Sequence, residues 1–562
     1  MTKHQINFDR FYQRFLNSYL LRRPVDASFI GRHEFDDMLP DFTPEGVRET
    51  KDELQLLLDE SRRFALDGLL CRQLLDKRMI EGYLEQTLWE FSSFHFHQGN
   101  PSMYVGEAVF GMLVCVLTKY APACVRLESM AARMEKMPMY FAQAKKNIDS
   151  SPAIWTKRAI QECEGGLAFL RHGLGRILKE ENYFSSRLQK ASYTAQVALS
   201  DYKHYLQNEL LQKPRDSVAA GRESFRMIVE KVHCADINLD EYLRYAQSEV
   251  ERTTKYLEAH AKDFGAATPQ EALAGLADFH PDAENYMSKF QEIWDAVENL
   301  AKENDLVTWP DFPIEYMNRY EWAKECAPYL YFIFYRPPAF FNRPVVMDYL
   351  APPLWPDFTP EQQKAFLRAN NNEVIKNNHV VHHGSLGHHV QSWNAYHQDK
   401  SYIGQFAACD GASRLVMLSS GTMAEGWAVY ATMLTSEYGF NTPLEDYAAV
   451  QARRRTAARS VVDIKLHCGD FTLEQAIDYY RTHVGMDEEA CVSEAVKNSM
   501  FPGGAIMYLY GSDLIYNFRE AVRIHKGAEF SVGRFHDDFL SFGSIPAALV
   551  KAELEREYGM NN

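Results

Sequence analysis

Apolar side chains recur at three- and four-residue steps along most of this chain, and no other feature constrains the fold as strongly. Residues 53–66 are an example, with leucines on one face of a helix and charged residues on the other. The same spacing returns between 160 and 260 and from about 359 to the C-terminus. A period near 3.6 residues is typical of amphipathic helices. The sequence therefore predicts a mainly α protein.

The helical pattern is interrupted between 328 and 356. Residues 328–335 are aromatic and β-branched and are bounded by prolines, which predicts an extended strand. Several further prolines keep the following residues irregular. Thr359, Pro360 and Gln362 then supply an N-cap, a proline at the first helical position and a capping-box glutamine. We therefore expect one large all-α body with a small sheet beside the histidine-rich segment described below.

The domain organisation follows from what the sequence lacks. A chain of 562 residues is long enough for several domains, but no repeat, low-complexity run or flexible linker divides it. We interpret 1–562 as a single large helical protein. Within it we distinguish an N-terminal helical half, 1–200, from a second half, 201–562, that contains the motifs of 379–519.

Charge and cysteine usage narrow the class of protein. The formal net charge of −16 argues against a nucleic-acid partner, because phosphate binding needs a basic surface. The nine cysteines form no CxxC pair, which is typical of reduced thiols. The N-terminus lacks an apolar leader, and the most apolar stretch, 108–118, is too short to span a bilayer. We expect a soluble cytoplasmic protein without a membrane partner; a homo-oligomer stays open.

Histidines gather in one short segment. Five of the nineteen histidines fall between 379 and 389. A later apolar and aromatic segment, 424–430, contains a single acidic residue, Glu425. Closely spaced imidazoles followed by a carboxylate from a second helix can hold a transition-metal ion.

Helix geometry decides which histidines can share an ion. His379 and His383 are four residues apart and would lie on one face of an α-helix. His382 and His388 are six apart, which on a helix separates them by roughly 120° in azimuth and about 9 Å along the axis. They could bind one ion only if the helix is interrupted between them. The segment Gly384-Ser-Leu-Gly387 supplies residues that permit such an interruption.

A family resemblance becomes specific at these residues. His382-His-Gly-Ser-Leu-Gly387-His388-His389-Val-Gln391 resembles the motif H-E-x-x-P-G-H-H-x-Q of a large bacterial family of zincin-like proteins known only as a domain of unknown function. That family is distantly similar to the all-α gluzincin carboxypeptidases and oligopeptidases. Glu425-Gly-Trp-Ala-Val-Tyr430 is similar to its E-G-W-A-x-Y block. Further similar blocks contain Arg459 to His467, Glu494, and Tyr508 through Arg519.

The resemblance implies a metal centre and a substrate cleft. His382, His388 and Glu425 would be the metal ligands, leaving coordination positions open, as catalytic zinc sites do. His389 and Gln391 would lie behind the ligands or face the substrate. The strand expected at 329–335 would pair with an extended substrate, as the edge strand of zincins does.

The chain departs from the family motif at the residue that matters most for peptide hydrolysis. His383 stands where the motif has a glutamate that acts as general base. Leu386 replaces the motif proline, and Lys497 stands for an arginine. Three alternatives follow: His383 is the base of a different hydrolytic or lytic reaction, it joins the metal ligands, or catalysis is lost.

Other candidates come from the later blocks. Arg459, Asp463 and His467 fall on one helix face, and we favour Asp463 orienting a catalytic His467 toward the cleft over a structural ion-pair ladder. Tyr508 or Tyr510 could donate a hydrogen bond to an oxyanion, and either could equally be a core residue. The remaining residues that we expect around the metal or substrate are His379, Glu494 and Arg519. The run 453–455, three arginines, reads as a solvated helix face, with a weaker carboxylate-binding alternative.

These observations together predict a metal-dependent enzyme, related to metallopeptidases and hydrolase-like. Its substrate would be a small polar amide- or amino-acid-derived molecule, or a short peptide, in a deep cleft between the helical halves. We expect one divalent ion, zinc in the first place. One alternative is an iron or manganese lyase or redox enzyme in which His379 joins His382, His383 and His388. The other is a non-catalytic descendant that binds a metal, ligand or protein.

Overall fold

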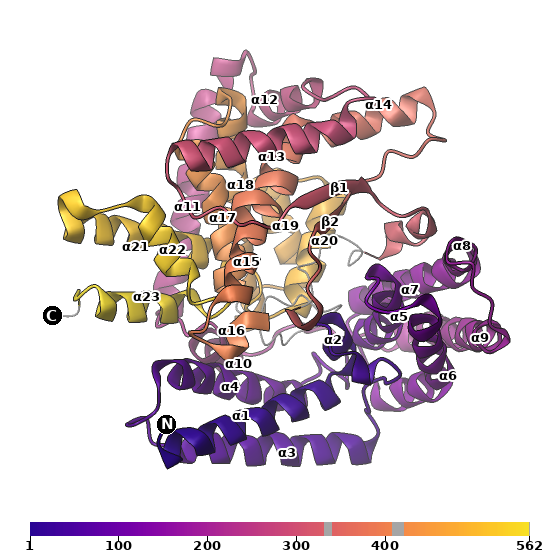
Figure 1. The fold of residues 1–562 in the computed structure, drawn as a ribbon. Coiled ribbons are helices and arrows are strands. Elements are labelled where there is room, and N and C mark those ends of the chain that lie inside the picture. Colours follow the sequence, from indigo (N-terminus) through magenta and orange to yellow (C-terminus); the bar gives the residue numbers. More distant parts are fainter. Residues whose placement is uncertain (331–339, 407–420, 561–562) are drawn as a thin grey trace. The chain divides into compact units, whose positions relative to one another are not determined.

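The computed structural model describes residues 1–330, 340–406 and 421–560. These residues are mainly helical and contain one small two-stranded parallel sheet (Figure 1). The predicted fold class is confirmed at this level. None of the helices in these ranges is both long enough and apolar enough to cross a membrane.

The chain forms two compact units. The first comprises Met1–Ala220 and the described residues of Arg319–Pro344. The second comprises Gly221–Asn318 and the described residues of Val345–Ala408 and Ser419–Asn562. All the predicted site residues belong to the second unit.

The first unit is built around one apolar helix, α5 (Pro101–Leu117). Asn100 caps it by accepting a hydrogen bond from the backbone of Met103, and proline follows at the first helical position. The helix is buried along nearly its whole length, which explains its continuous apolar sequence. The other helices of this unit are α1 (Lys3–Arg22), α2 (Pro24–Phe29), α3 (Pro44–Arg63), α4 (Cys71–Glu90), α6 (Ala123–Asn147), α7 (Ala153–Ala168), α8 (Leu174–Glu180) and α9 (Ser186–Asn208).

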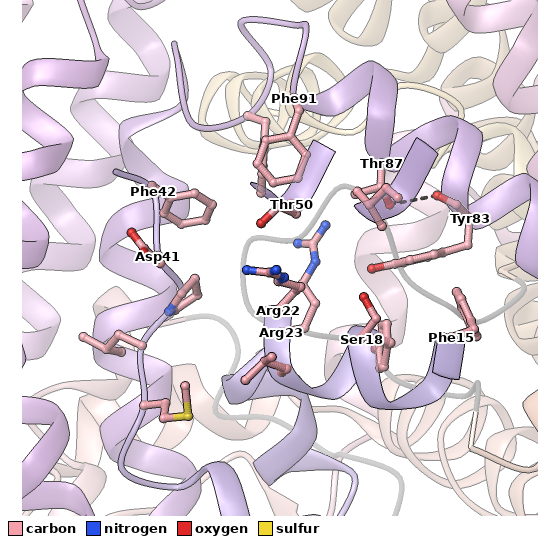
Figure 2. A pocket seen from close by; sticks show the side chains of 17 residues that line it. Phe15, Ser18, Arg22, Arg23, Asp41, Phe42, Thr50, Tyr83, Thr87 and Phe91 are labelled. Atoms are coloured by element: carbon pink, nitrogen blue, oxygen red, sulfur yellow. Dashed lines mark hydrogen bonds between the residues drawn. The ribbon is translucent and has the colours of Figure 1, made fainter. Parts of the chain in front are cut away.

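A pocket whose lining mixes aromatic, aliphatic and polar side chains lies in the first unit (Figure 2). Arg23 reaches it and forms an ion pair with Glu90 at 3.0 Å, and both side chains are buried. Its guanidinium also lies 5.1 Å from the ring centre of Phe96. Arg23 therefore satisfies its charge within the protein, as a buried ion must. None of the predicted site residues lines this pocket.

The second unit contains most of the helices. The capping box predicted at the start of α14 is confirmed, because Thr359 accepts from the backbone of Gln362 and the glutamine side chain accepts in return from Thr359. The helices of this unit are α10 (Arg222–Met227), α11 (Leu239–His260), α12 (Pro269–Ala274), α13 (Tyr286–Glu303), α14 (Pro360–Ala369), α15 (Val390–His397), α16 (Tyr402–Phe406), α17 (Gly421–Glu437), α18 (Pro443–Cys468), α19 (Leu473–Val484), α20 (Glu488–Met500), α21 (Ile506–Lys526), α22 (Val532–Leu540) and α23 (Ala547–Glu557).

The sheet consists of β1 (Ile314–Asn318) and β2 (Met347–Ala351) in parallel register. It lies beside the histidine segment, as expected, because the hydroxyl of Tyr349 is 2.7 Å from Nδ1 of His379. The structure describes only the first residues of the strand predicted at 328–335. Ala327–Tyr329 form a 3₁₀ turn and not a strand, and residues 331–335 lie outside the described residues.

Helices α17 and α21 cross in backbone contact. A Cβ atom added to Gly426 would lie 2.6 Å from Cα of Gly511, and one added to Gly511 would lie 2.4 Å from the carbonyl oxygen of Thr422. Only glycine permits this approach. The crossing places Glu425, next to Gly426, near Tyr508, one turn before Gly511.

We expect Gly426→Ala to destabilise the protein by about 1–3 kcal/mol, because the added methyl overfills the crossing of α17 and α21. Gly275→Ala is the matched control, since the nearest atom to its new methyl would be a leucine carbon at 3.8 Å. That control should be neutral or slightly stabilising. Urea unfolding followed by circular dichroism measures both; equal effects of the two changes would contradict the packing argument.

Candidate metal centre

The histidine segment is not a regular helix. It begins as a wide π-helical stretch, η10 (Val374–His382), and continues as a second one, η11 (Ser385–His389), that leads into α15. Between and within them the backbone leaves helical angles, at Gly384 (φ −99°, ψ −144°) and at Gly387 (φ −78°, ψ −120°). The predicted interruption is confirmed. Irregular π-type turns of this kind are frequent at functional sites.

The interruption brings three imidazoles together. One ring nitrogen each from His382, His383 and His388 lies within 4.8 Å of the other two. The ring centres of His382 and His388 are 5.0 Å apart, although a continuous helix would hold these residues on different faces.

Glu425 on α17 completes the cluster. Its Oε2 is 3.2 Å from Nε2 of His382 and 3.7 Å from Nε2 of His388. A tetrahedral zinc ion with ligands at 2.0–2.1 Å has edges of about 3.3 Å between ligand atoms. The separations of these three side chains therefore fit such an ion. His383 lies next to them and could be a fourth ligand.

The protonation states suit a cation. Burial lowers the pKa of His388 to about 4 and lowers the pKa of His383 well below its usual value. Both imidazoles are therefore neutral at pH 7, which is the form that binds metal. Burial acts to raise the pKa of Glu425, but the hydrogen bond to His382 and the neighbouring His388 lower it far below its usual value. The cluster thus offers the ionised carboxylate of Glu425 and the neutral imidazoles of His383 and His388.

Several hydrogen bonds hold the interrupted segment in place. The indole N–H of Trp427, which is 1% exposed, donates to the carbonyl of Leu386 at 2.7 Å. The hydroxyl of Ser385 donates to the carbonyl of Val380, also at 2.7 Å. Because Trp427 is two residues from Glu425 on α17, the bond to Leu386 ties the carboxylate helix directly to the break. This satisfies a carbonyl that the break removes from helical bonding.

Three predicted neighbours of the metal are fixed in the structure around it. His379 is bonded to Tyr349 and lies against a phenylalanine of α13. His389 is buried and donates from Nε2 to the carbonyl of Phe312 at 2.7 Å. Gln391 is buried and donates to the hydroxyl of Ser544. Of the two alternatives for His389 and Gln391, burial argues against a place that faces the substrate and favours the one behind the ligands. Both side chains anchor the start of α15.

A cluster of charged side chains surrounds Tyr508, the first-turn tyrosine of α21. Arg459 pairs with Glu494 through Nε and Oε2 at 2.8 Å, and its guanidinium carbon lies 5.3 Å from the Tyr508 ring centre. The ammonium of Lys497 lies 5.9 Å from the same ring. The predicted residues Arg459, Glu494 and Tyr508 are thus brought together. In the sequence, Lys497 stands out only as a replacement for an arginine of the family motif. Its spacing of three residues from Glu494 would place both side chains on one face of a helix, and that spacing was the signal that could have identified it.

Asp463 and His467 serve the core. The carboxylate of Asp463 accepts from the backbone N–H groups of Gly503, Ala505 and Ile506 at 3.0–3.1 Å, which caps the start of α21. His467 is 0% exposed, donates to the carbonyl of Asn498 at 2.8 Å and stacks on a phenylalanine of α10. The prediction of a catalytic His467 facing a cleft is therefore wrong. The face of α18 that carries His467 is covered by an apolar cluster that includes Phe225, Leu239 and Ile464.

Two further candidates lie away from the cluster. Tyr510 packs against an apolar group of α10 and α11 and is a core residue, the alternative left open. Arg519 donates to the hydroxyl of Tyr430 at 3.1 Å and pairs with Glu437 at 2.9 Å. It braces α17 against α21 and does not contact the histidines.

The fold and the site together define a mainly helical protein with a candidate metal centre of histidine and glutamate side chains. The model of the family described as "Bacterial protein of unknown function (DUF885)" matches residues 24–554. The chain therefore belongs to this family, and the expected membership of a bacterial family known only as a domain of unknown function is confirmed. The zincin-like relationship stays a prediction. No curated protein matches the chain.

Two solved structures share the fold. One is from Shewanella oneidensis and is described as a "putative lipoprotein of unknown function"; it has 20% identity and a TM-score of 0.78, over 97% of this chain and 99% of that one. The other, from Colwellia psychrerythraea, is also described as a "putative lipoprotein", with 16% identity, a TM-score of 0.76 and all of both chains covered. These descriptions contradict the cytoplasmic location expected from the sequence, and that expectation is withdrawn.

We expect Gly387→Ala to weaken zinc binding by about 10–100-fold, the range seen when the surroundings of metal ligands are disturbed. A Cβ atom at this position would lie 1.9 Å from the carbonyl oxygen of His382, so the backbone that carries His388 must move. Competition with a chromogenic zinc chelator measures the affinity. Gly275→Ala is the control, and an unchanged affinity in Gly387→Ala would contradict the role assigned to the break.

Stability should fall as the pH is lowered from about 6.5 to 4. Burial lowers the pKa of His467 from 6.5 to about 4, so between these values the unfolded chain binds a proton that the folded chain does not. His467→Gln, which keeps a donor for Asn498, should reduce the slope of unfolding free energy by up to about 1.4 kcal/mol per pH unit. Urea unfolding at pH 5, 6 and 7 measures it. His525→Gln is the control, because His525 is exposed. This variant should keep a steeper slope of unfolding free energy against pH than His467→Gln.

Proposed function

We propose that this protein is a zincin-like, metal-dependent hydrolase that acts on an amide bond of a small polar substrate. One observation carries the proposal: His382 and His388, six residues apart, converge with Glu425 at separations that suit one zinc ion. The similarity of the two motifs to those of gluzincins supports the same reading, and the family description leaves the activity open.

The residues that would hold the ion are His382, His388 and Glu425. A divalent ion bound there supplies Lewis acidity, which polarises a carbonyl and acidifies water. His382 and Glu425 are hydrogen-bonded to each other and half-buried, so the donor set is preorganised and still reachable from solvent. That combination is what a catalytic site needs, in contrast to a fully enclosed structural one.

His383 is the residue that sets this chain apart from its family motif. Its depressed pKa keeps the imidazole neutral at pH 7, so it can accept a proton from an attacking water. Burial makes it a weaker base than an exposed imidazole, which favours substrates more reactive than an ordinary peptide bond. Tyr508 and Lys497 lie on a neighbouring helix pair and could offset negative charge that develops on the carbonyl oxygen.

A second function is favoured by one specific observation. The nitrogen atoms of His382, His383 and His388 are mutually within 4.8 Å, and a ligand set of three imidazoles suits iron as well as zinc. In that case His383 is a ligand and the reaction is lyase or redox chemistry. His379 is not part of this group of three, and its Nδ1 is bonded to Tyr349.

Metal analysis of the purified protein tests the proposal. We expect one equivalent of zinc, lost in His388→Ala and in Glu425→Ala and retained in the control His397→Ala, whose histidine is exposed. Iron in place of zinc supports the second function. Protein that binds neither metal, with no change in melting temperature on adding either, contradicts both.

His383 can be tested separately from the other ligands. If it is the base, His383→Ala keeps its zinc but loses about 10²–10⁴-fold in turnover of amide substrates. If it is a ligand, zinc affinity falls together with turnover. His383→Glu restores the motif carboxylate, and a gain of peptidase activity in that variant would show that the cleft still accepts peptides. A variant His383→Ala with full activity rules out the proton-acceptor role.

A further inference from the structure

The charged cluster around Tyr508 contains two cations that form no ion pair with the described residues. Its cations are Arg455 and Arg459 from α18 and Lys497 from α20. Glu494 forms an ion pair with Arg459. Arg455 and Lys497 make no hydrogen bond and no ion pair with any residue in the described parts of the chain, and both are exposed. Two positive charges of this cluster therefore face solvent.

The arrangement is unfavourable without an anion. Arg455 and Arg459 are four residues apart on one helix, where like charges repel. The nearby Arg459 is the main cause that lowers the pKa of Arg455. Lys497 is held in the same cluster by the Tyr508 ring, and Tyr508 is the main cause that raises its pKa. Three carboxylates act on these two cations: Glu494 on both, Glu373 on Arg455 and Glu425 on Lys497. None of the three forms a hydrogen bond or an ion pair with Arg455 or Lys497 in the described residues.

The cluster and the metal centre belong to one site. The close crossing of α17 and α21 places Tyr508 near Glu425. The charge of Glu425 also contributes to the raised pKa of Lys497, so the ammonium and the carboxylate lie within electrostatic reach of each other. A molecule whose reacting bond lies at the histidines can therefore reach Lys497 and Arg455 with its other end.

We propose that Arg455 and Lys497 bind a carboxylate of the substrate, so that the substrate is an N-acyl amino acid or a short peptide with a free carboxyl end. A guanidinium binds a carboxylate through two parallel hydrogen bonds, and an ammonium adds a compact charge. Glu494 holds Arg459 back from the anion and keeps it beside the Tyr508 ring. The assignment of the reacting bond rests on the proposed hydrolase function; the assignment of the carboxylate site does not.

Binding is measured first, because it needs no turnover. The zinc-loaded full-length protein is titrated calorimetrically with a panel of N-acetyl amino acids, each compared with its own C-terminal amide. We expect the acids that bind to do so at least about tenfold more tightly than their amides. Arg455→Gln and Lys497→Gln should each reduce this preference to about threefold or less.

Matched variants separate charge from folding. Arg455→Lys and Lys497→Arg keep the charge and should keep most of the preference. Arg534→Gln removes an arginine that is 76% exposed and has only a 3.8 Å contact to Asp538, and it should leave the preference unchanged. Inorganic phosphate is titrated as well, and phosphate that binds more tightly than every acid overturns the carboxylate assignment.

The proposal is overturned if acids and amides bind equally or not at all, or if the preference survives both glutamine variants. Turnover of N-acetyl dipeptides is measured in parallel. A preference for acids without any turnover supports the carboxylate site and counts against the hydrolase. Turnover without a preference for acids supports the hydrolase and refutes the carboxylate site.

Discussion

The break in the helix between His382 and His388 is the constraint on which the candidate site depends. Two imidazoles six residues apart can meet only if the backbone leaves helical angles, and it does so at Gly384 and Gly387. The polar groups that the break releases need new partners. One of these partners, the indole of Trp427, comes from the helix that carries the glutamate, so the repair of the break also positions the third donor.

Close packing, and not hydrogen bonding, positions the part of the site that α17 and α21 supply. Gly426 and Gly511 let α17 and α21 touch through their backbones, and Arg519 braces the same pair further along. As a result, the candidate metal centre and the cluster around Tyr508 draw side chains from five segments, namely the histidine segment, α17, α18, α20 and the start of α21. Because each helix is held by its own packing, the site is preorganised without depending on long loops.

Parts of the fold and site followed from local patterns, and parts did not. The capping box at Thr359 and the break at the glycines depend on residues within a few positions of each other, and both are confirmed. The role of His467 was predicted wrongly because it depends on contacts with distant residues. Its spacing from Asp463 is equally compatible with a cleft and a core, and burial against α10 decides between them. Lys497 was overlooked as a candidate because its relation to Glu425 exists only in three dimensions.

The sequence by itself determined the mainly helical class, the family and the need for a break if His382 and His388 are to meet, because helix periods, caps and glycine freedom act over a few residues. It also supplied the short list of candidate metal donors. Only the tertiary structure decided which candidate donors converge, that His389, Gln391 and His467 are buried, and that Arg459 and Lys497 gather around Tyr508. Burial and long-range charge contacts depend on how distant helices pack, and packing leaves no local signature in a single chain.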